Sequence, residues 1–340
     1  MKKYFKDKKV LVTGGTGSIG SSVVQKLLEE KCDIIRVLGS DENGLHNLSL
    51  QFGESSNFFD AMKKNKIRYM YGDITDQDRM LTACEDIDIV IHAAAMKHVP
   101  ICEYNPFEAT KVNVIGTQNM IKAALSQKIK KFILISTDKV VDPTTCLGAT
   151  KLLAEKITLN SNLNKGKKQT IFSVVRFGNV IGTRGSVLPK FIYQIKNNQN
   201  ITLTNKYSTR FFVTVKDSVN TIINSIFLMK GGEVFIPKTI NAIKISDLAQ
   251  SLLNYHSESK SKIIFTELRS GEKIHEKIIT ENEYLKLKLA ADLFVIDFFN
   301  NQNLKKVDRK VNYFDSSSAN LLNKNQIVDY LKKNSLIDIH

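Results

Sequence analysis

The stretch Lys9–Gly20, KVLVTGGTGSIG, decides the fold. Its first five residues, KVLVT, form a short run with an apolar, largely β-branched centre, which is typical of a buried parallel strand. Gly14, Gly17 and Gly20 follow with the spacing GxxGxxG, and helical spacing of apolar residues then continues to Lys31. Small residues let the backbone approach phosphates, and the N-terminus of a helix attracts negative charge. The order strand, glycine-rich turn, helix therefore predicts a dinucleotide diphosphate site.

The same alternation of strand and helix continues along the chain. Apolar runs predict strands at 33–38, 67–71, 87–94, 131–136 and 171–176, and helical spacing predicts helices at 105–128 and 149–160. Alternation of this kind predicts an α/β protein with a Rossmann-type, doubly wound parallel sheet. We expect residues 1–181 to form an NAD(P)-binding Rossmann domain that also holds the catalytic residues. Residues 182–340 would be a smaller, mainly substrate-binding part with some chain returning to the sheet.

Composition narrows the class of protein. The net charge of +15 comes from scattered lysines with no RNA-binding signature, so we expect an anionic diphosphate substrate and no nucleic acid. The four cysteines have no CxxC spacing and no nearby histidine cluster, which predicts reduced thiols and no metal site. We also expect a cytoplasmic protein, because no run of 18 apolar residues and no signal-peptide core occurs.

The tip of the second strand bears on the choice between NAD and NADP. An acidic side chain there would bind both ribose hydroxyls and favour NAD. Gly39 occupies that place, which leaves room for a 2′-phosphate, with Ser40 as a donor and Arg36 or Lys66 as a countercharge. Asp41, two residues later, argues for NAD. We favour NADP.

Other residues complete the expected cofactor site. Gly72-Asp73-Ile74 follows the third strand and would contact the adenine edge, although a simple strand-ending turn is the alternative. In all, we place the cofactor against Gly14, Thr16, Gly17, Ser18, Ile19, Gly20, Ser40, Asp41, Asp73, Ile74, Ala93, Ala94, Lys97, Asn113 and Lys151.

The stretch Ser136–Lys139, STDK, ends the fifth strand at the edge where open α/β sheets bind ligands. In short-chain dehydrogenases the usual proton carrier is a tyrosine four residues before a lysine such as Lys151. Leu147 stands at that position and cannot transfer a proton. Either the enzyme is inactive, or Asp138 and Lys139 carry the proton chemistry, with pKa values moved toward neutrality by burial and mutual charge. We favour a catalytic role for Asp138 and Lys139 over a purely structural ion pair at the end of the strand.

At this point the chain resembles the extended short-chain dehydrogenases that act as nucleotide-sugar 4,6-dehydratases of the capsule and flagellin-glycan type. The matching segments are KKVLVTGGTGSIGSSVVQKLLE, IVIHAAAMKHVPICEYNPFEATKVNVIGT, KKFILISTDKVVDPTTCLGATKLLAEK, VVRFGNVIGTRGSVLPKFIYQI, RFFVTVKDSV and RSGEKIHEKII. Together they cover most of residues 8–280. The chain is similar to the retaining branch of this group, in which Met replaces the tyrosine. It lacks the N-terminal helices of membrane-anchored members and so resembles the short forms of legionaminic-acid pathways. The substrate would be UDP- or GDP-N-acetylglucosamine.

The resemblance implies a role for each matching residue. Thr137 would hydrogen-bond the sugar 4-hydroxyl or its 4-keto oxygen, Asp138 would help to expel the 6-hydroxyl, and Lys139 would remove the C5 proton. Lys151 would hold the nicotinamide ribose, and Lys97 would approach the sugar or the nicotinamide, so both count among the catalytic residues. Leu147 would be a wall against the sugar. Substrate contacts are expected from Lys97, His98, Asn179, Arg184, Ser186, Arg210, Arg269 and Glu272. Arg210 and Arg269 would bind the diphosphate, Glu272 would bind the nucleotide ribose or pair with Lys273, and Arg184 and Ser186 would lie on a loop closing over the nucleotide.

Three other functions remain open. A nucleotide-sugar 4-epimerase would use the same scaffold, and a C5-inverting dehydratase would differ in product only. A catalytically silent NADP-sensing protein is the non-enzymatic alternative, although the intact Asp138–Lys139 pair argues against it. We also expect a homo-oligomer and a tightly bound cofactor, because the reaction has no net redox change.

Overall fold

A ten-stranded central sheet organises the protein, which a computed structural model describes for residues 4–52, 66–238, 240–299, 304–307 and 314–337. The strand order is β15-β13-β14-β10-β6-β5-β4-β1-β2-β3. The strands from β10 to β3 pair in parallel, whereas β14, β13 and β15 add an antiparallel edge. The sheet comprises β1 (Lys9–Thr13), β2 (Ile34–Gly39), β3 (Ile67–Tyr71), β4 (Ile89–His92), β5 (Lys131–Thr137), β6 (Ile171–Phe177), β10 (Glu233–Pro237), β13 (Leu287–Ala290), β14 (Leu293–Asp297) and β15 (Lys305–Lys306). This parallel core is the expected Rossmann-type fold.

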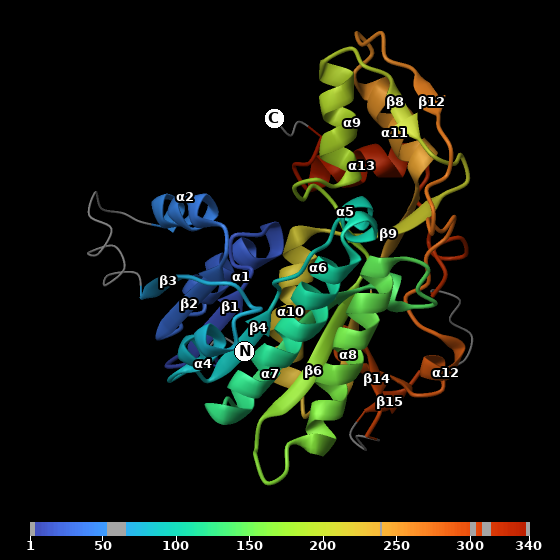
Figure 1. Cartoon of the computed structure of the whole chain (residues 1–340). Coiled ribbons are helices and arrows are strands. Elements are labelled where there is room, and N and C mark those ends of the chain that lie inside the picture. The colour runs from blue at the N-terminus through green and yellow to red at the C-terminus, as the bar shows by residue number, and fades with distance from the viewer. Residues whose placement is uncertain (1–3, 53–65, 239, 300–303, 308–313, 338–340) are drawn as a thin grey trace.

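Helices cover both faces of the sheet (Figure 1). Alternate residues of β1 point to opposite faces: Leu11 joins one apolar core with α4, α7 and α8, and Val10 and Val12 join another with α1, α2 and α10. This division is what a doubly wound sheet requires. The helices are α1 (Ser18–Glu29), α2 (Glu42–Phe52), α4 (Gln77–Cys84), α5 (Val99–Tyr104), α6 (Pro106–Thr110), the π-helical η1 (Lys111–Gly116), α7 (Thr117–Ser126), the 3-10 turn η2 (Asp138–Val140), α8 (Cys146–Asn164) and α10 (Val215–Leu228).

A smaller part lies beyond the carboxyl ends of the parallel strands, at the top of Figure 1. It has its own apolar core, formed around Phe191, Leu248 and Leu331. Its elements are β7 (Asn179–Val180), α9 (Val187–Lys196), β8 (Ile201–Leu203), β9 (Thr209–Val213), β11 (Asn241–Lys244), α11 (Ile245–Tyr255), β12 (Ile263–Phe265) and α13 (Lys324–Lys333), and α12 (Glu281–Tyr284) lies beside the main sheet. The strands β10, β13, β14 and β15 come from beyond residue 182 but belong to the main sheet. The exact boundary at residues 181 and 182 stays a prediction.

The cysteines and the helices bear on two expectations. Cys32, Cys84, Cys102 and Cys146 are free thiols, as expected. Within the described ranges, no helix has both the length and the apolarity needed to cross a bilayer.

A buried ion network ties the late part of the chain to the sheet. Arg176, on β6, is 1% exposed and lies between the carboxylates of Glu155 on α8, at 2.7 Å, and Glu283 on α12, at 2.9 Å. It also donates to the carbonyl oxygen of Ile278 at 3.0 Å. A buried guanidinium is tolerated only when carboxylates and carbonyls satisfy its donors. The network therefore holds the segment that follows Ile278 against the body of the protein.

We predict that Glu155→Ala lowers the free energy of unfolding by about 3 kcal/mol, because it leaves a buried guanidinium with half of its countercharge. Urea unfolding followed by circular dichroism measures the change. Glu29→Ala, which breaks the solvent-exposed pair with Lys26, is the matched control and should cost less than about 1 kcal/mol. Equal losses for the two variants would contradict the assigned role of the network.

Candidate active site

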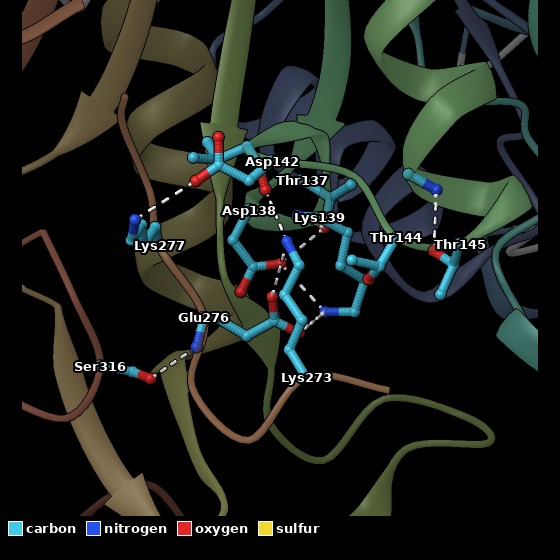
Figure 2. A network of polar contacts seen from close by, with 12 residues as sticks. Thr137, Asp138, Lys139, Asp142, Thr144, Thr145, Lys273, Glu276, Lys277 and Ser316 are labelled. Carbon is cyan, nitrogen blue, oxygen red and sulfur yellow. Dashed lines mark hydrogen bonds and ion pairs between the residues drawn. The ribbon is translucent and has the colours of Figure 1, made fainter. Parts of the chain in front are cut away.

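Thr137 marks the point where β5 gives way to the catalytic stretch. Its backbone is extended, and its hydroxyl accepts a hydrogen bond from the backbone N–H of Lys139 at 3.5 Å, so it caps the short turn η2. The same hydroxyl donates to Oδ1 of Asp138 at 2.9 Å (Figure 2). The cap thereby places three consecutive polar side chains at the carboxyl edge of the sheet.

Asp138 and Lys139 form an ion pair with a third partner, Asn179, from the short strand β7 that follows β6. The ammonium Nζ of Lys139 lies 2.9 Å from Oδ1 of Asp138, which is fully buried, and donates to Oδ1 of Asn179 at 3.0 Å. Asn179 reaches this position because β6 pairs in register with β5, so that Phe177 lies beside Thr137. The structure thus brings together four of the residues predicted from the sequence.

The protonation state of Lys139 differs from the one expected. Burial alone would lower its pKa, but the carboxylates of Asp138 and Glu276 outweigh burial, and the pKa is raised. The expectation that the pKa of Lys139 moves toward neutrality is therefore wrong. In this conformation Lys139 is an ammonium ion, and it must lose a proton before it can act as a base.

Glu276 is the residue of this site that sequence reasoning missed. Its Oε1 lies 3.7 Å from Nζ of Lys139, and its Oε2 lies 3.9 Å from Nζ of Lys273, as Figure 2 shows. The sequence did contain a signal, because Glu276 is part of the matching segment RSGEKIHEKII. Arg269, Glu272 and Lys273 of that segment entered the prediction, but Glu276 did not, since nothing local shows that it points at a strand end more than a hundred residues away.

Lys151 lies beneath the same strand end. It is 6% exposed, and its Nζ donates to the carbonyl oxygen of Ile135 on β5 at 2.7 Å. Burial lowers the pKa of Lys151 to about 8, and Glu155, one helical turn further, partly offsets this. Leu147, on the first turn of α8, is 5% exposed and packs with Cys102 and Ala109. An apolar side chain therefore fills the position at which short-chain dehydrogenases usually have a tyrosine.

The glycine-rich turn has the close packing that a cofactor diphosphate requires. Gly14 has φ +65°, and a Cβ placed on it would lie 2.8 Å from Cα of Ala94. A Cβ on Gly20 would lie 2.2 Å from the carbonyl oxygen of Gly14. The helix α1 begins directly after Gly17, so its first amide groups point out of the turn without helical partners. Backbone and helix N-terminus thus fit a dinucleotide diphosphate.

Asn113 anchors the neighbouring segment. It lies in the π-helical turn η1 and is 1% exposed; its side chain accepts from the backbone N–H of Met96 at 2.9 Å and donates to the carbonyl oxygen of Met96 at 3.2 Å. Ala94 donates its backbone N–H to Oγ1 of Thr13 at 3.2 Å. The predicted residues Ala93 and Ala94 therefore lie in a segment fixed beside the glycine-rich turn.

Arg184 lies over the glycine-rich turn. Its guanidinium donates to the carbonyl oxygen of Thr16, and its backbone N–H donates to Oγ of Ser18 at 3.3 Å. Lys97 donates to the carbonyl oxygen of Arg184 at 3.0 Å. These contacts hold its loop against the cofactor side of the turn, and closure of the loop over a substrate nucleotide stays a prediction.

The rest of that loop packs closely. Gly185 has φ +72°, and a Cβ on it would lie 2.5 Å from Cε1 of His98. Ser186 precedes α9, and its hydroxyl is buried with no hydrogen-bond partner within the described part of the chain. His98 therefore packs against the loop that carries Gly185 and Ser186. The substrate roles of His98 and Ser186 remain predictions.

The contacts of Arg36 and Lys66 contradict the role predicted for them near the tip of β2. Arg36 donates to the carbonyl oxygens of Ala83 at 2.7 Å and Glu85 at 2.9 Å, so it caps the end of α4. Lys66 pairs with Asp33 at 3.3 Å, at the opposite end of the strands from the glycine-rich turn. Both proposed countercharges for a 2′-phosphate are therefore wrong.

Asp41 is also occupied. Its Oδ1 accepts from the backbone N–H of Gly44 at 2.9 Å, in the first turn of α2, while Ser40 stays exposed beside it. Asp73 accepts from both the backbone N–H and the hydroxyl of Thr75 at 2.8 Å, and Ile74 is 5% exposed. The strand-ending turn considered for Asp73 is thus present, and an adenine contact remains a prediction.

Arg210 and Glu272 hold each other in the smaller part. Arg210 donates to the carbonyl oxygens of Thr209, Lys273 and Ile274 at 2.8–2.9 Å and lies 3.4 Å from Oε1 of Glu272. Glu272 therefore pairs with Arg210. The alternative predicted from the sequence, a pair between Glu272 and Lys273, is not what the structure shows. These contacts use Arg210 to fix the segment that carries Glu276. Arg269 is exposed on the same segment.

The chain belongs to the family of polysaccharide biosynthesis proteins, whose model matches residues 10–297. A solved structure described as Pen from Bacillus thuringiensis superposes with a TM-score of 0.89 at 39% identity, covering 98% of this chain and 99% of that one.

Three curated relatives bear different names. A protein of Methanocaldococcus jannaschii, named an uncharacterized membrane protein, is 44% identical over 98% of both chains. A UDP-N-acetylglucosamine 4,6-dehydratase (inverting) of Campylobacter jejuni is 42% identical over 82% of this chain and 79% of its own. A UDP-glucose 4-epimerase of Rickettsia bellii is 37% identical over 85% of this chain and 82% of its own. The resemblance read from the sequence is thus confirmed at the level of the family.

We predict a specific pH dependence from Lys151. Its pKa is lowered from 10.5 to about 8 in the folded protein, so between these values the unfolded chain binds more protons and stability rises with pH. Relative to Lys151→Met, the wild-type protein should gain about 1.4 kcal/mol per pH unit between pH 8 and 10. Urea unfolding at several pH values measures the difference, and Lys156→Met, at an exposed site of the same helix, is the control. Curves that stay parallel for wild type and Lys151→Met would refute the assigned pKa.

Proposed function

We propose that the protein is a nucleotide-sugar 4,6-dehydratase that converts UDP- or GDP-N-acetylglucosamine to the 4-keto-6-deoxy sugar for a surface glycan. The observation that carries the proposal is the chain of contacts from Thr137 through Asp138 to Lys139. These residues lie at the carboxyl end of β5, at the same end of the parallel strands as the glycine-rich turn. The name of the Campylobacter relative supports it.

A nicotinamide cofactor fits this chain, because Gly14 and Gly20 permit the tight turn that sets the N-terminus of α1 directly after the end of β1. When bound, it would supply the acceptor and donor of hydride that the reaction needs at C4 and C6. Lys151 would hold its ribose, and the close packing around Arg184 and Lys97 supports tight retention. Retention matters because the reaction has no net redox change.

Thr137 and Asp138 provide a proton route that needs no tyrosine. Oxidation at C4 releases the O4 proton, and the Thr137 hydroxyl can accept it while passing its own proton to Oδ1 of Asp138 at 2.9 Å. Asp138 then holds the proton that the C6 hydroxyl requires to leave as water. Its Oδ2 is buried and has no hydrogen-bond partner in the described chain, which supports this role because a proton on the carboxyl group lowers the cost of that burial.

Lys139 is the proposed base for C5, and we propose that C5 keeps its configuration. Leu147 supports retention, because no tyrosine is available at that helical position to donate a proton from a second direction. The Campylobacter relative is named as inverting, so the C5 outcome is where this chain would differ from it. Asn179 would orient both Lys139 and the sugar.

The remaining substrate contacts are proposals with different support. Arg269 is exposed and suited to the diphosphate, while Lys97 and His98 contact the loop that carries Arg184 and Ser186. Arg210 and Glu272 would act mainly by shaping the segment around them. We also propose a homo-oligomer, because Tyr104, Phe107, Ile115 and Leu153 expose large apolar side chains on contacting helices.

We propose NADP as the preferred cofactor, on revised grounds. Gly39 leaves the strand tip without an acid, and Ser40 lies next to the N-terminus of α2, whose partial positive charge suits a 2′-phosphate. The carboxylate of Asp41 accepts a hydrogen bond from the backbone N–H of Gly44 in α2, so it is less available to bind a ribose hydroxyl.

The second candidate is a nucleotide-sugar 4-epimerase, which the name of the Rickettsia relative supports. An epimerase needs no acid for a leaving hydroxyl, so it does not explain why Asp138 is buried against both Thr137 and Lys139. The two activities are separated by product mass, because only dehydration removes water.

We predict that the purified enzyme converts UDP- or GDP-N-acetylglucosamine to a product lighter by one water, with the gluco configuration kept at C5. Asp138→Asn and Lys139→Ala should each lower turnover at least about 10²-fold, the usual cost of an acid–base group, with cofactor still bound. Mass spectrometry and proton coupling constants measure the outcome. Lys277→Gln, at an exposed site, is the control. An epimer of unchanged mass would favour the second candidate, and an inverted C5 would refute retention.

We predict that NADP binds at least about tenfold more tightly than NAD, the effect of one charge-assisted contact. Ser40→Asp should reverse the preference, because a carboxylate at the strand tip binds ribose hydroxyls and repels a phosphate. Isothermal titration calorimetry with both cofactors gives the two constants. Tighter binding of NAD by the wild-type protein would overturn the assignment.

A further inference from the structure

The ammonium group of Lys139 has three protons and three neighbours. Asp138 Oδ1 at 2.9 Å and Asn179 Oδ1 at 3.0 Å accept two of them. The third neighbour is Oε1 of Glu276 at 3.7 Å. Asn179 is neutral and Asp138 is proposed to serve the leaving hydroxyl. Glu276 is therefore the remaining group beside Lys139 that could take its proton.

Glu276 is built into the site rather than exposed at its rim. It is 4% exposed, and its backbone N–H donates to the buried hydroxyl of Ser316 at 2.8 Å (Figure 2). That hydroxyl lies 2.7 Å from the hydroxyl of Thr209 on β9. Oε2 of Glu276 is buried without a hydrogen-bond partner in the described chain. A buried carboxylate oxygen without a donor is costly, and a proton on it removes the cost.

The charges around Glu276 come from three parts of the chain. Asp138 and Lys139 face it from η2, Arg210 lies 3.8 Å away on β9, and Lys273 lies 3.9 Å away on its own segment. Burial and the charge of Asp138 raise the pKa of Glu276, and this outweighs the three cations. The carboxyl group is thus closer to accepting a proton than an exposed glutamate would be.

We propose that Glu276 is the proton partner of Lys139, taking the ammonium proton so that a free amine faces C5 of the sugar. The inference rests on the proposed dehydratase function. A bound sugar would exclude water, and a dry site favours a neutral acid and amine over an ion pair. The 3.7 Å separation exceeds a hydrogen bond, so the two side chains must approach before transfer.

The proton count closes over one cycle. A bond between Nζ of Lys139 and hydrogen breaks and an O–H bond forms on Glu276. The amine then takes the C5 proton, the C5–H electrons form the C5–C6 double bond, and the C6–O bond breaks with the Asp138 proton leaving in water. After hydride reaches C6, Lys139 returns its proton to C5, and Glu276 returns its own to the amine. Glu276 acts through Lys139 and is therefore a positioning residue.

The test is the pH dependence of turnover in Glu276→Gln. An amide cannot take the proton, so Lys139 must lose it to solvent, and kcat should fall about 10²-fold and rise about tenfold per unit from pH 6.5 to 8.5. Wild-type kcat should stay nearly flat over this range. Glu276→Asp, which keeps the acid, should be slower than wild type but equally flat. Glu281→Gln, an exposed glutamate of α12, is the control.

The outcomes separate this inference from the proposed function. If wild type releases no water from any nucleotide sugar, the dehydratase proposal fails and the role of Glu276 falls with it. If wild type dehydrates its substrate while Glu276→Gln keeps a flat profile, only the proton-partner role is overturned, whether kcat is normal or reduced. A sloped profile in Glu276→Gln together with a flat one in Glu276→Asp supports the inference.

Discussion

The ammonium group of Lys139, on a side chain that is 21% exposed, is the constraint on which the rest of the site depends. A charge removed from water must be met by opposite charge and by hydrogen-bond acceptors. Asp138 meets it from the same turn, Asn179 from the segment after the next strand, and Glu276 from a segment far along the chain. The smaller part of the protein is therefore more than a cover over a ligand. It supplies a carboxylate that sets the charge state of a residue in the Rossmann part.

Two further arrangements serve this one. Arg176 joins α8, β6 and α12 through buried carboxylates, and so fixes the late chain beside the sheet that carries the catalytic stretch. Arg210 uses its donors on the main chain around Lys273 and Ile274, which holds the segment that presents Glu276. Of these two guanidinium groups, the sequence predicted that Arg210 binds the substrate diphosphate. In the folded protein both hold segments of the main chain in place, because a guanidinium fork has enough donors for several carboxylate and carbonyl oxygens at once.

The predicted cofactor site depends on a different constraint, namely that Gly14 and Gly20 have no side chain. Gly14 and Gly20 lie where a Cβ would overlap Ala94 or the turn itself, and α1 starts immediately beyond. This feature could be read from spacing, since small residues between a strand and a helix have few other uses. The position of Arg184 over the same turn could not. It depends on how a loop from the second half of the chain folds back, and no local pattern encodes that return.

The sequence by itself determined the alternation of strands and helices, the glycine-rich turn and the placing of Thr137, Asp138 and Lys139 at a strand end. These features are local, because periodicity, turn chemistry and strand termination are each written in about ten neighbouring residues. Only the tertiary structure decided that Glu276 adjoins Lys139, that Arg36 and Lys66 lie away from the cofactor turn, and that the pKa of Lys139 rises instead of falling. Electrostatic effects depend on distance and burial, and both are set by contacts between segments that are remote in sequence.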